Sequence, residues 1–152
     1  MYKQPSLSLL VVEDSNEDFE AFRRIVNEVG TMDLSIVRCH DGDDALEHLQ
    51  QRQAVPQPPL PDVIVLDLNL PGTDGREVIA EVKQNDKLKT IPIVVLTTSS
   101  NPKDVEACYR FGANSYMLKS MDIRLFKASI QQFLDFWFKA TVLPSSNQES
   151  RP

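Results

Sequence analysis

Apolar residues gather in three short runs that predict buried strands: Leu7–Val12, Val63–Leu66 and residues 91–96. Each run is nearly continuous and rich in Val, Ile and Leu. This pattern is typical of a parallel sheet that helices cover on both faces, because neither face meets water and the polar–apolar alternation is lost. Two weaker patterns predict further strands at Leu34–Cys39 and Ser115–Leu118.

Between these strands, apolar residues recur at intervals of three and four positions, which predicts amphipathic helices. The expected helices span Asn16–Val29 and residues 43–51, 74–84, 101–111 and 122–141. Gly30 and Gly112 directly follow two of these helices and are expected to end them. Pro102 falls in the first turn of the helix over residues 101–111, where proline is tolerated. Residues 52–61 contain four prolines, which predict an extended loop before the third strand.

Strand and helix therefore alternate five times, which predicts an α/β fold with a doubly wound parallel sheet and right-handed crossovers. We expect a single domain over residues 1–142, followed by a disordered tail over the polar, Pro- and Ser-rich residues 143–152. In this architecture the loops that follow the strands gather at one edge of the sheet. Ligands bind at that edge, near the point where the strand order reverses.

Charge and composition exclude several classes of protein. The formal net charge of −6 argues against nucleic acid as the main partner, because phosphate backbones require a basic surface. No segment approaches the ~20 apolar residues of a membrane span, and the first eight residues lack the features of a signal peptide. Cys39 and Cys108 form no CxxC pair and no disulfide framework. We expect a cytoplasmic protein that contacts neither nucleic acid nor membrane directly.

The chemistry-bearing residues follow four of the predicted strands. Glu13 and Asp14 come after the first strand, and Asp67 comes after the third. Thr97 and Lys119 come after the fourth and fifth. Because the carboxyl ends of parallel strands meet at one edge, we expect three carboxylates, a hydroxyl and an ammonium around one small site.

A divalent cation is needed to make such a site stable, since three crowded carboxylates repel one another unless a cation sits among them. Mg²⁺ fits best because it is a hard, octahedral ion that prefers oxygen ligands and accepts a phosphate oxygen; Mn²⁺ accepts the same ligands. We expect Asp14 and Asp67 to bind the metal directly, together with the backbone carbonyl of Asn69. Glu13 is expected to act through water or through a hydrogen bond behind the metal.

Asp67 is also the best candidate nucleophile, because a carboxylate at the end of a rigid strand can accept a phosphoryl group as an acyl phosphate. Lys119 and the metal would stabilise charge on the phosphoryl oxygens, and Thr97 would donate a hydrogen bond to one of them. Taken singly, an Asp at a strand end is more often a helix cap and a Lys is more often solvated. The ordered combination of all four groups is what favours function.

Two other functions on the same fold are possible and disfavoured. Asp-based phosphatases place a second Asp two residues after the nucleophile, where this chain has Asn69, and the sequence has no cap insertion to form a substrate pocket. A flavin- or nucleotide-binding protein needs a loop after the first strand that attracts phosphate, whereas Glu13 and Asp14 repel it.

These motifs resemble those of the receiver domains of two-component response regulators. The matching elements, spread over residues 7–141, are Glu13-Asp14, Asp67 with Leu70-Pro71-Gly72, Thr97, Gly112-Ala113 with Tyr116, and Lys119. The resemblance implies a flavodoxin-like fold with five strands in the order 2-1-3-4-5 and five helices. It implies a histidine kinase as phosphodonor and a phosphoacceptor signalling protein rather than an enzyme. Phosphorylation would draw Thr97 inward and turn Tyr116 toward the interior, altering the face formed by the fourth helix, fifth strand and fifth helix.

A narrower resemblance is to the small regulators that pair with cyanobacterial phytochromes. It is carried by residues 66–76, 96–99, 101–104 and 133–137. It implies a phytochrome-type kinase, a homodimer and no output domain after Thr141. The alternatives are a different kinase, or a role as intermediate in a phosphorelay.

One position departs from the receiver pattern, in which proline usually follows the lysine in a cis peptide. Here Ser120 follows Lys119, and a cis bond before a non-proline residue costs about 2.5–4 kcal/mol. We expect Lys119 still to reach the site, held less rigidly.

The last predicted helix is apolar over more than half of its circumference, which is wider than a single core contact requires. At 100° per residue, Phe133 and Trp137 belong to the core stripe, while Leu125 and Phe136 lie to one side of it. Aromatic residues are enriched at interfaces, so we expect a homodimer interface that includes Leu125, Phe133, Phe136 and Trp137. The alternative is that the tail or the fourth helix covers the excess apolar surface.

Overall fold

The structure is a computed structural model that describes residues 7–30, 33–55 and 59–144. Its centre is a parallel sheet in the order β2-β1-β3-β4-β5. The strands are β1 (Leu7–Val12), β2 (Leu34–Cys39), β3 (Val63–Leu66), β4 (Ile93–Thr97) and β5 (Ser115–Leu118). The predicted fold class and strand order are therefore confirmed.

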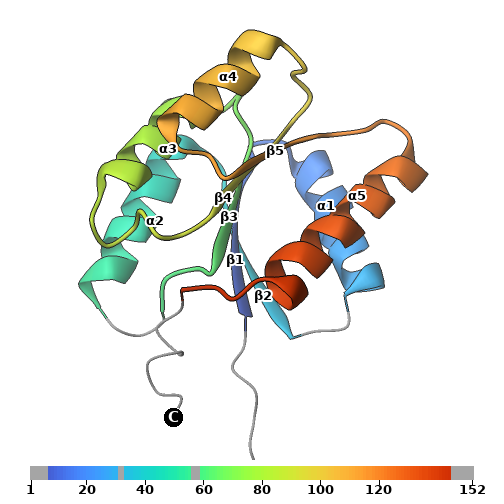
Figure 1. Cartoon of the computed structure of the whole chain (residues 1–152), viewed down its shortest axis with the longest axis horizontal. Helices are drawn as coiled ribbons and strands as arrows, with labels where there is room; N and C mark the ends of the chain where they lie inside the picture. Colours follow the sequence, from blue (N-terminus) through green and yellow to red (C-terminus); the bar gives the residue numbers. More distant parts are fainter. Residues whose placement is uncertain (1–6, 31–32, 56–58, 145–152) are drawn as a thin grey trace, which may run out of the picture.

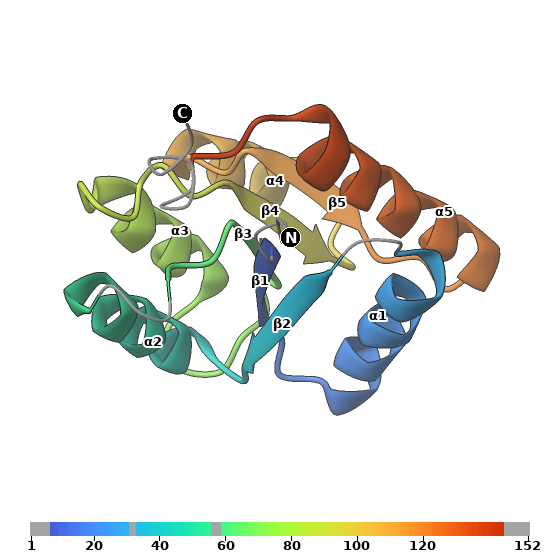
Figure 2. The same ribbon diagram turned by 90° about the horizontal axis from the view of Figure 1, so that it is seen from below.

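Five α-helices follow the strands and cover both faces of the sheet. They are α1 (Asn16–Val29), α2 (Gly42–Ala54), α3 (Gly75–Gln84), α4 (Pro102–Phe111) and α5 (Ile123–Asp135). Figures 1 and 2 show α1 and α5 on one face and α2, α3 and α4 on the other. Within the described part of the chain, no helix is long and apolar enough to cross a membrane.

Each face of the sheet has its own hydrophobic core, because successive residues of a strand point to opposite faces. Leu9 and Val11 of β1 pack with α1 and α5, whereas Leu10 and Val12 pack with the other three helices. All four side chains are at most 4% exposed. This burial on both faces explains why the central strands read as continuous apolar runs.

The helix boundaries follow local capping chemistry. The side chains of Ser15, Asp41, Asp74, Asn101 and Asp122 each accept a backbone N–H of the first turn of the helix that they precede. Gly112 ends α4 with φ +112°, a conformation that favours glycine.

Three predicted boundaries were wrong. Strand β4 begins at Ile93 rather than at residue 91, because Pro92 has no N–H for the sheet ladder. Helix α2 continues to Ala54, into the predicted loop 52–61, because residues 42–54 contain no proline. The last helix is not continuous to residue 141: α5 ends at Asp135, and a π-helical turn, η1 (Phe136–Ala140), follows it.

The η1 turn changes how the end of the chain packs. The N–H of Thr141 donates to the carbonyl of Phe136 at 3.0 Å, and the Thr141 hydroxyl donates to the carbonyl of Trp137 at 2.7 Å. Leu143, which the sequence assigns to the tail, is only 7% exposed and packs in the core beside α1 and α5. The predicted tail from residue 145 onward lies outside the described residues.

Candidate functional site

The sheet brings the predicted site residues to its carboxyl edge through backbone hydrogen bonds that extend beyond the strands. The N–H of Asp67 donates to the carbonyl of Val12 at 3.1 Å, and the N–H of Lys119 donates to the carbonyl of Thr97 at 2.8 Å. These bonds fix the acceptor loop to β1 and the lysine to β4. Residues separated by more than one hundred positions therefore meet at one place.

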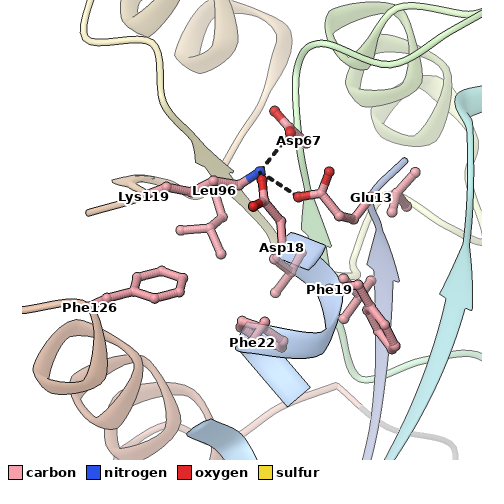
Figure 3. Close-up of a pocket in the computed structure, with 11 residues that line it drawn as sticks. Glu13, Asp18, Phe19, Phe22, Asp67, Leu96, Lys119 and Phe126 are labelled. Atoms are coloured by element: carbon pink, nitrogen blue, oxygen red, sulfur yellow. Dashed lines mark hydrogen bonds and ion pairs between the residues drawn. The ribbon is translucent and has the colours of Figure 1, made fainter. Parts of the chain in front are cut away.

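The ammonium of Lys119 lies at the centre of the site (Figure 3). Its Nζ is 2.8 Å from Asp67 Oδ2 and 2.8 Å from Asp18 Oδ2, and it also forms an ion pair with Glu13 Oε1. The Lys119 side chain is 11% exposed, and the side chains of Glu13 and Asp67 are 6% and 10% exposed. The ion pairs of Lys119 with Glu13 and Asp67 are therefore shielded from water. Charge-assisted hydrogen bonds are stronger in such surroundings than in water.

Three carboxylates form the acidic cluster that the sequence predicts. One oxygen each from Glu13, Asp14 and Asp67 lies within 4.8 Å of the others, and Asp14 is exposed while the other two are buried. This donor set consists of hard carboxylate oxygens open to solvent on one side, which suits a divalent cation that retains several waters.

Burial and charge move the pKa values of the two buried carboxyl groups in opposite directions. Burial raises the pKa of Glu13 to about 7, assisted by the negative charge of Asp67 and opposed by Lys119. Burial would also raise the pKa of Asp67, but the hydrogen bond and charge of Lys119 outweigh it and hold that pKa below its ordinary value. The pKa of Lys119 is raised, because its three carboxylate partners outweigh the effect of its burial. Asp67 is thus ionised at neutral pH, whereas Glu13 titrates near it.

Thr97 and Asn69 flank Asp67. The Thr97 hydroxyl is fully buried and makes no hydrogen bond of normal geometry with the described residues, although it lies close enough to Asp67 to help lower the pKa of that carboxyl. The backbone N–H of Asn69 donates to Asp67 Oδ1 at 3.3 Å. A buried hydroxyl without a hydrogen-bond partner reduces the stability of the fold. An oxygen-rich ligand at Asp67 would accept a hydrogen bond from it.

Tyr116 is partly buried against the core and belongs to a polar network that the sequence did not reveal. Its hydroxyl donates to the backbone carbonyl of Ser99 at 2.7 Å, and Ser99 Oγ donates to Asp104 Oδ2 at 2.6 Å. Asp104 also accepts from Arg76 at 3.0 Å, and Arg76 pairs with Asp74 at the start of α3. The network connects the loop after Asp67 with the loop after Thr97.

Sequence reasoning missed two further residues that shape the site. Asp18 lies in the first turn of α1, where an acidic residue is usually explained by the helix dipole, so no sequence pattern indicated its contact with Lys119. Arg38 of β2 donates from Nε and Nη2 to the carbonyl of Glu13 at 3.1 and 3.0 Å, and its guanidinium lies 4.8 Å from the centre of the Phe19 ring. No local pattern distinguishes Arg38 from a solvated residue on an edge strand.

The residues of the predicted dimer interface divide into two groups. Phe133 is 4% exposed and its ring packs 6.5 Å from that of Phe22, so it belongs to the core of this chain. Trp137 is partly buried against the same core. Leu125 and Phe136 are 63% and 54% exposed, so an interface on this helix would rest on these two.

Comparisons with known proteins agree with the geometry of the site. The family model for the response regulator receiver domain matches residues 9–131. Response regulator Rcp1 of Synechocystis sp. is 43% identical over 145 residues, which cover 93% of this chain and 96% of Rcp1.

Solved structures extend the likeness to the whole fold. The phosphorylated cyanobacterial phytochrome response regulator RcpA superposes with a TM-score of 0.85 at 35% identity, covering 93% of this chain and all of that one. The Mn²⁺-bound form of Rcp1 superposes with a TM-score of 0.82 at 41% identity, covering 92% and 99% of the two chains. With the acidic cluster and the buried lysine at the carboxyl edge of a 2-1-3-4-5 sheet, these matches show that the chain belongs to the family of response regulator receiver domains.

Proposed function

We propose that this protein accepts a phosphoryl group on Asp67 in the presence of Mg²⁺ and thereby switches a protein–protein interaction. As a receiver, it is a phosphoacceptor signalling protein rather than an enzyme with a separate substrate. The observation that carries the proposal is that Asp67 Oδ2 lies 2.8 Å from Lys119 Nζ, while one oxygen each of Glu13, Asp14 and Asp67 lie within 4.8 Å of one another.

Asp67, Lys119 and Thr97 have different roles in the proposed phosphoryl transfer. An ionised Asp67 oxygen forms a bond to phosphorus as the bond between phosphorus and the leaving group of the donor breaks, and the leaving group takes the electron pair. Lys119 stabilises the negative charge on the phosphoryl oxygens, and Thr97 Oγ1 donates a hydrogen bond to one of them. Hydrolysis of the resulting acyl phosphate by water restores the carboxylate.

Glu13, Asp14 and Asp67 are the residues that would hold the cation, together with the backbone carbonyl of Asn69. When bound, Mg²⁺ or Mn²⁺ would neutralise charge on the phosphoryl oxygens. Arg38 supports this role indirectly, because its two hydrogen bonds hold the Glu13 backbone in place.

The switch is proposed to run from Thr97 to Tyr116. Thr97 ends β4, and the next loop contains Ser99, whose carbonyl accepts the Tyr116 hydroxyl. When Thr97 turns its hydroxyl toward the phosphoryl group, the loop shifts and with it the environment of Tyr116. The surface that changes is the one formed by α4, β5 and α5.

A phytochrome-type histidine kinase in the cytoplasm is the proposed donor. The support is the 43% identity to Rcp1 and the similarity to RcpA, which is a cyanobacterial phytochrome response regulator. The alternatives are another histidine kinase or a phosphorelay. Competition among purified autophosphorylated kinases would decide: the phytochrome must transfer its phosphoryl group at least as fast as any other for this assignment to stand.

We also propose a homodimer through the exposed side of α5 and η1. Leu125 and Phe136 present apolar surface there, and apolar patches of this kind mark interaction sites. Light scattering at micromolar concentration should give twice the mass of the chain. Phe136→Glu should give monomers, whereas Phe111→Glu, at a residue 46% exposed on α4, should leave the dimer intact; a monomeric unmodified protein, with and without phosphorylation, would exclude the interface.

The central test is intact-mass spectrometry after incubation with acetyl phosphate. We expect one added phosphoryl group that requires Mg²⁺ and is absent from Asp67→Asn. Phosphorylation that persists in Asp67→Asn at the same rate would place the acceptor elsewhere and refute the assignment.

A further inference from the structure

Among the described residues, Asp18 is the one carboxylate paired with Lys119 that lies outside the acidic cluster of Glu13, Asp14 and Asp67. Its Oδ2 is 2.8 Å from Lys119 Nζ, the same distance as that of Asp67 Oδ2. An ammonium has three N–H donors, and Glu13, Asp18 and Asp67 accept one each. The head of Lys119 is therefore held from three sides by three different elements.

The position of Asp18 is fixed by the start of α1. Ser15 caps the helix, and its Oγ accepts the backbone N–H of Asp18 at 3.2 Å. The side chain of Asp18 is 47% exposed, whereas that of Lys119 is 11% exposed. Asp18 thus reaches the ammonium from the more exposed side of the site, and Figure 3 shows its carboxylate beside the head of Lys119.

Apart from Glu13, Asp18 and Asp67, the described residues that line the pocket beside Lys119 are apolar. Phe19, Phe22, Leu96 and Phe126 line the same pocket with apolar side chains. An ammonium cannot be buried against such a wall without its acceptors. If its carboxylate partners are removed, Lys119 must turn outward to water.

Phosphorylation removes partners in this way, and the inference here rests on the proposed function. Asp67 becomes an acyl phosphate, and Glu13 and Asp67 are the carboxylates expected to face the cation, which also repels the ammonium. The phosphoryl oxygens then face the ammonium in place of the Asp67 carboxylate, and Asp18 is the partner of Lys119 that faces neither the phosphoryl group nor the cation. We propose that Asp18 is a positioning residue for phosphoryl transfer, which holds the Lys119 ammonium beside Asp67 while the other two carboxylates are engaged.

The sign of the effect of Asp18→Asn distinguishes positioning from simple charge. The donor and the product are anionic, so removing one nearby negative charge would accelerate the reaction if charge alone mattered. If Asp18 positions Lys119, the same change slows the reaction, by about 10-fold, as for other residues that orient a catalytic group through hydrogen bonds. Glu17→Gln is the matched control, since Glu17 is an exposed acid in the same helical turn and forms no ion pair within the described residues.

The kinetic experiment measures phosphorylation by acetyl phosphate at saturating Mg²⁺ in a double-mutant cycle with Lys119→Met. We expect Asp18→Asn to lower the maximal rate about 10-fold with little change in the acetyl phosphate concentration at half-maximal rate. Glu17→Gln should change neither. In the Lys119→Met background, Asp18→Asn should have no further effect, because the residue through which it acts is gone.

A second readout uses Mg²⁺-loaded protein without donor, in which the cation engages the other carboxylates around Lys119. The two protons on Cε of a lysine have different chemical shifts when the side chain is fixed, and they merge when it rotates freely. Lysine-selective ¹³C NMR should show separate Lys119 Cε protons in the unmodified protein and in Glu17→Gln, and merged ones in Asp18→Asn. Far-UV circular dichroism confirms that each variant is folded.

The outcomes separate this inference from the proposed function. A protein that takes no phosphoryl group on Asp67 from any donor overturns both. Normal phosphorylation with an unchanged or faster rate in Asp18→Asn overturns the inference alone, as does an equal loss of rate in the Lys119→Met background. A slower rate that depends on Lys119, together with merged Cε protons, supports it.

Discussion

Metal affinity should depend steeply on pH between pH 6 and 8, because Glu13 titrates in this range. Its pKa of about 7 arises mainly from burial, whereas the pKa of Asp67 lies below its ordinary value, so Asp67 stays ionised throughout. For a pKa near 7, Glu13 is ionised in about one tenth of the molecules at pH 6 and in about nine tenths at pH 8. A cation that favours the ionised form should bind roughly tenfold more tightly at pH 8.

Isothermal titration calorimetry with Mg²⁺ at both pH values measures this ratio directly. In buffers with different heats of ionisation, binding should release about 0.9 protons at pH 6 and about 0.1 at pH 8. Glu13→Gln, which cannot ionise, should lose the tenfold ratio and most of the proton release. Glu17→Gln should behave as the unmodified protein.

The same titration has a consequence for stability that follows from linkage. A carboxyl group whose pKa is raised in the folded state binds more protons when folded than when unfolded. Its contribution to stability is complete below the unfolded value of 4.5 and is lost as the pH rises through about 7. The difference in unfolding free energy between the unmodified protein and Glu13→Gln, measured in urea without metal, should therefore shift in favour of Glu13→Gln from pH 4.5 to pH 8. An unchanged Mg²⁺ affinity across pH 6 to 8, or a tenfold ratio that persists in Glu13→Gln, would refute this account of Glu13.

Three further predictions test other parts of the structure. Lys119→Met leaves the buried carboxylates of the site without their ammonium partner. Urea unfolding should therefore show a loss of about 3–5 kcal/mol in unfolding free energy, which Mg²⁺ partly restores; an equal loss with and without Mg²⁺ would contradict this. Leu134 and Leu125 lie on the same helix with 1% and 63% exposure, so Leu134→Ala should cost about 2–5 kcal/mol of unfolding free energy and Leu125→Ala less than about 0.5 kcal/mol in the monomer; similar losses would show that the burial is wrong. Gly75→Ala places a Cβ 2.6 Å from the backbone carbonyl oxygen of Asp67, so it should destabilise the protein by about 1–3 kcal/mol and slow phosphorylation by acetyl phosphate; a normal rate would show that the acceptor loop tolerates the shift.

The elements of the fold could be predicted because they depend on local patterns. Continuous apolar runs mark strands that are buried on both faces, and the caps and glycines mark most helix ends. The prediction failed where the deciding interaction is not local. The last helix was predicted to continue to residue 141 from its apolar residues, but a π-helical turn occupies Phe136–Ala140, and Leu143, assigned to the tail, packs against the core beside α1 and α5.

The candidate site shows the same division. The types of residue needed for the chemistry and their places after four strands were determined by the sequence alone, because parallel strand ends must share one edge. The partners of Lys119 were decided by tertiary structure: which carboxylates reach an ammonium within 2.8 Å depends on the angle at which α1 leaves β1. Asp18 and Arg38 therefore escaped prediction, and so did the pKa of Glu13, since burial and neighbouring charge exist only once the chain has folded.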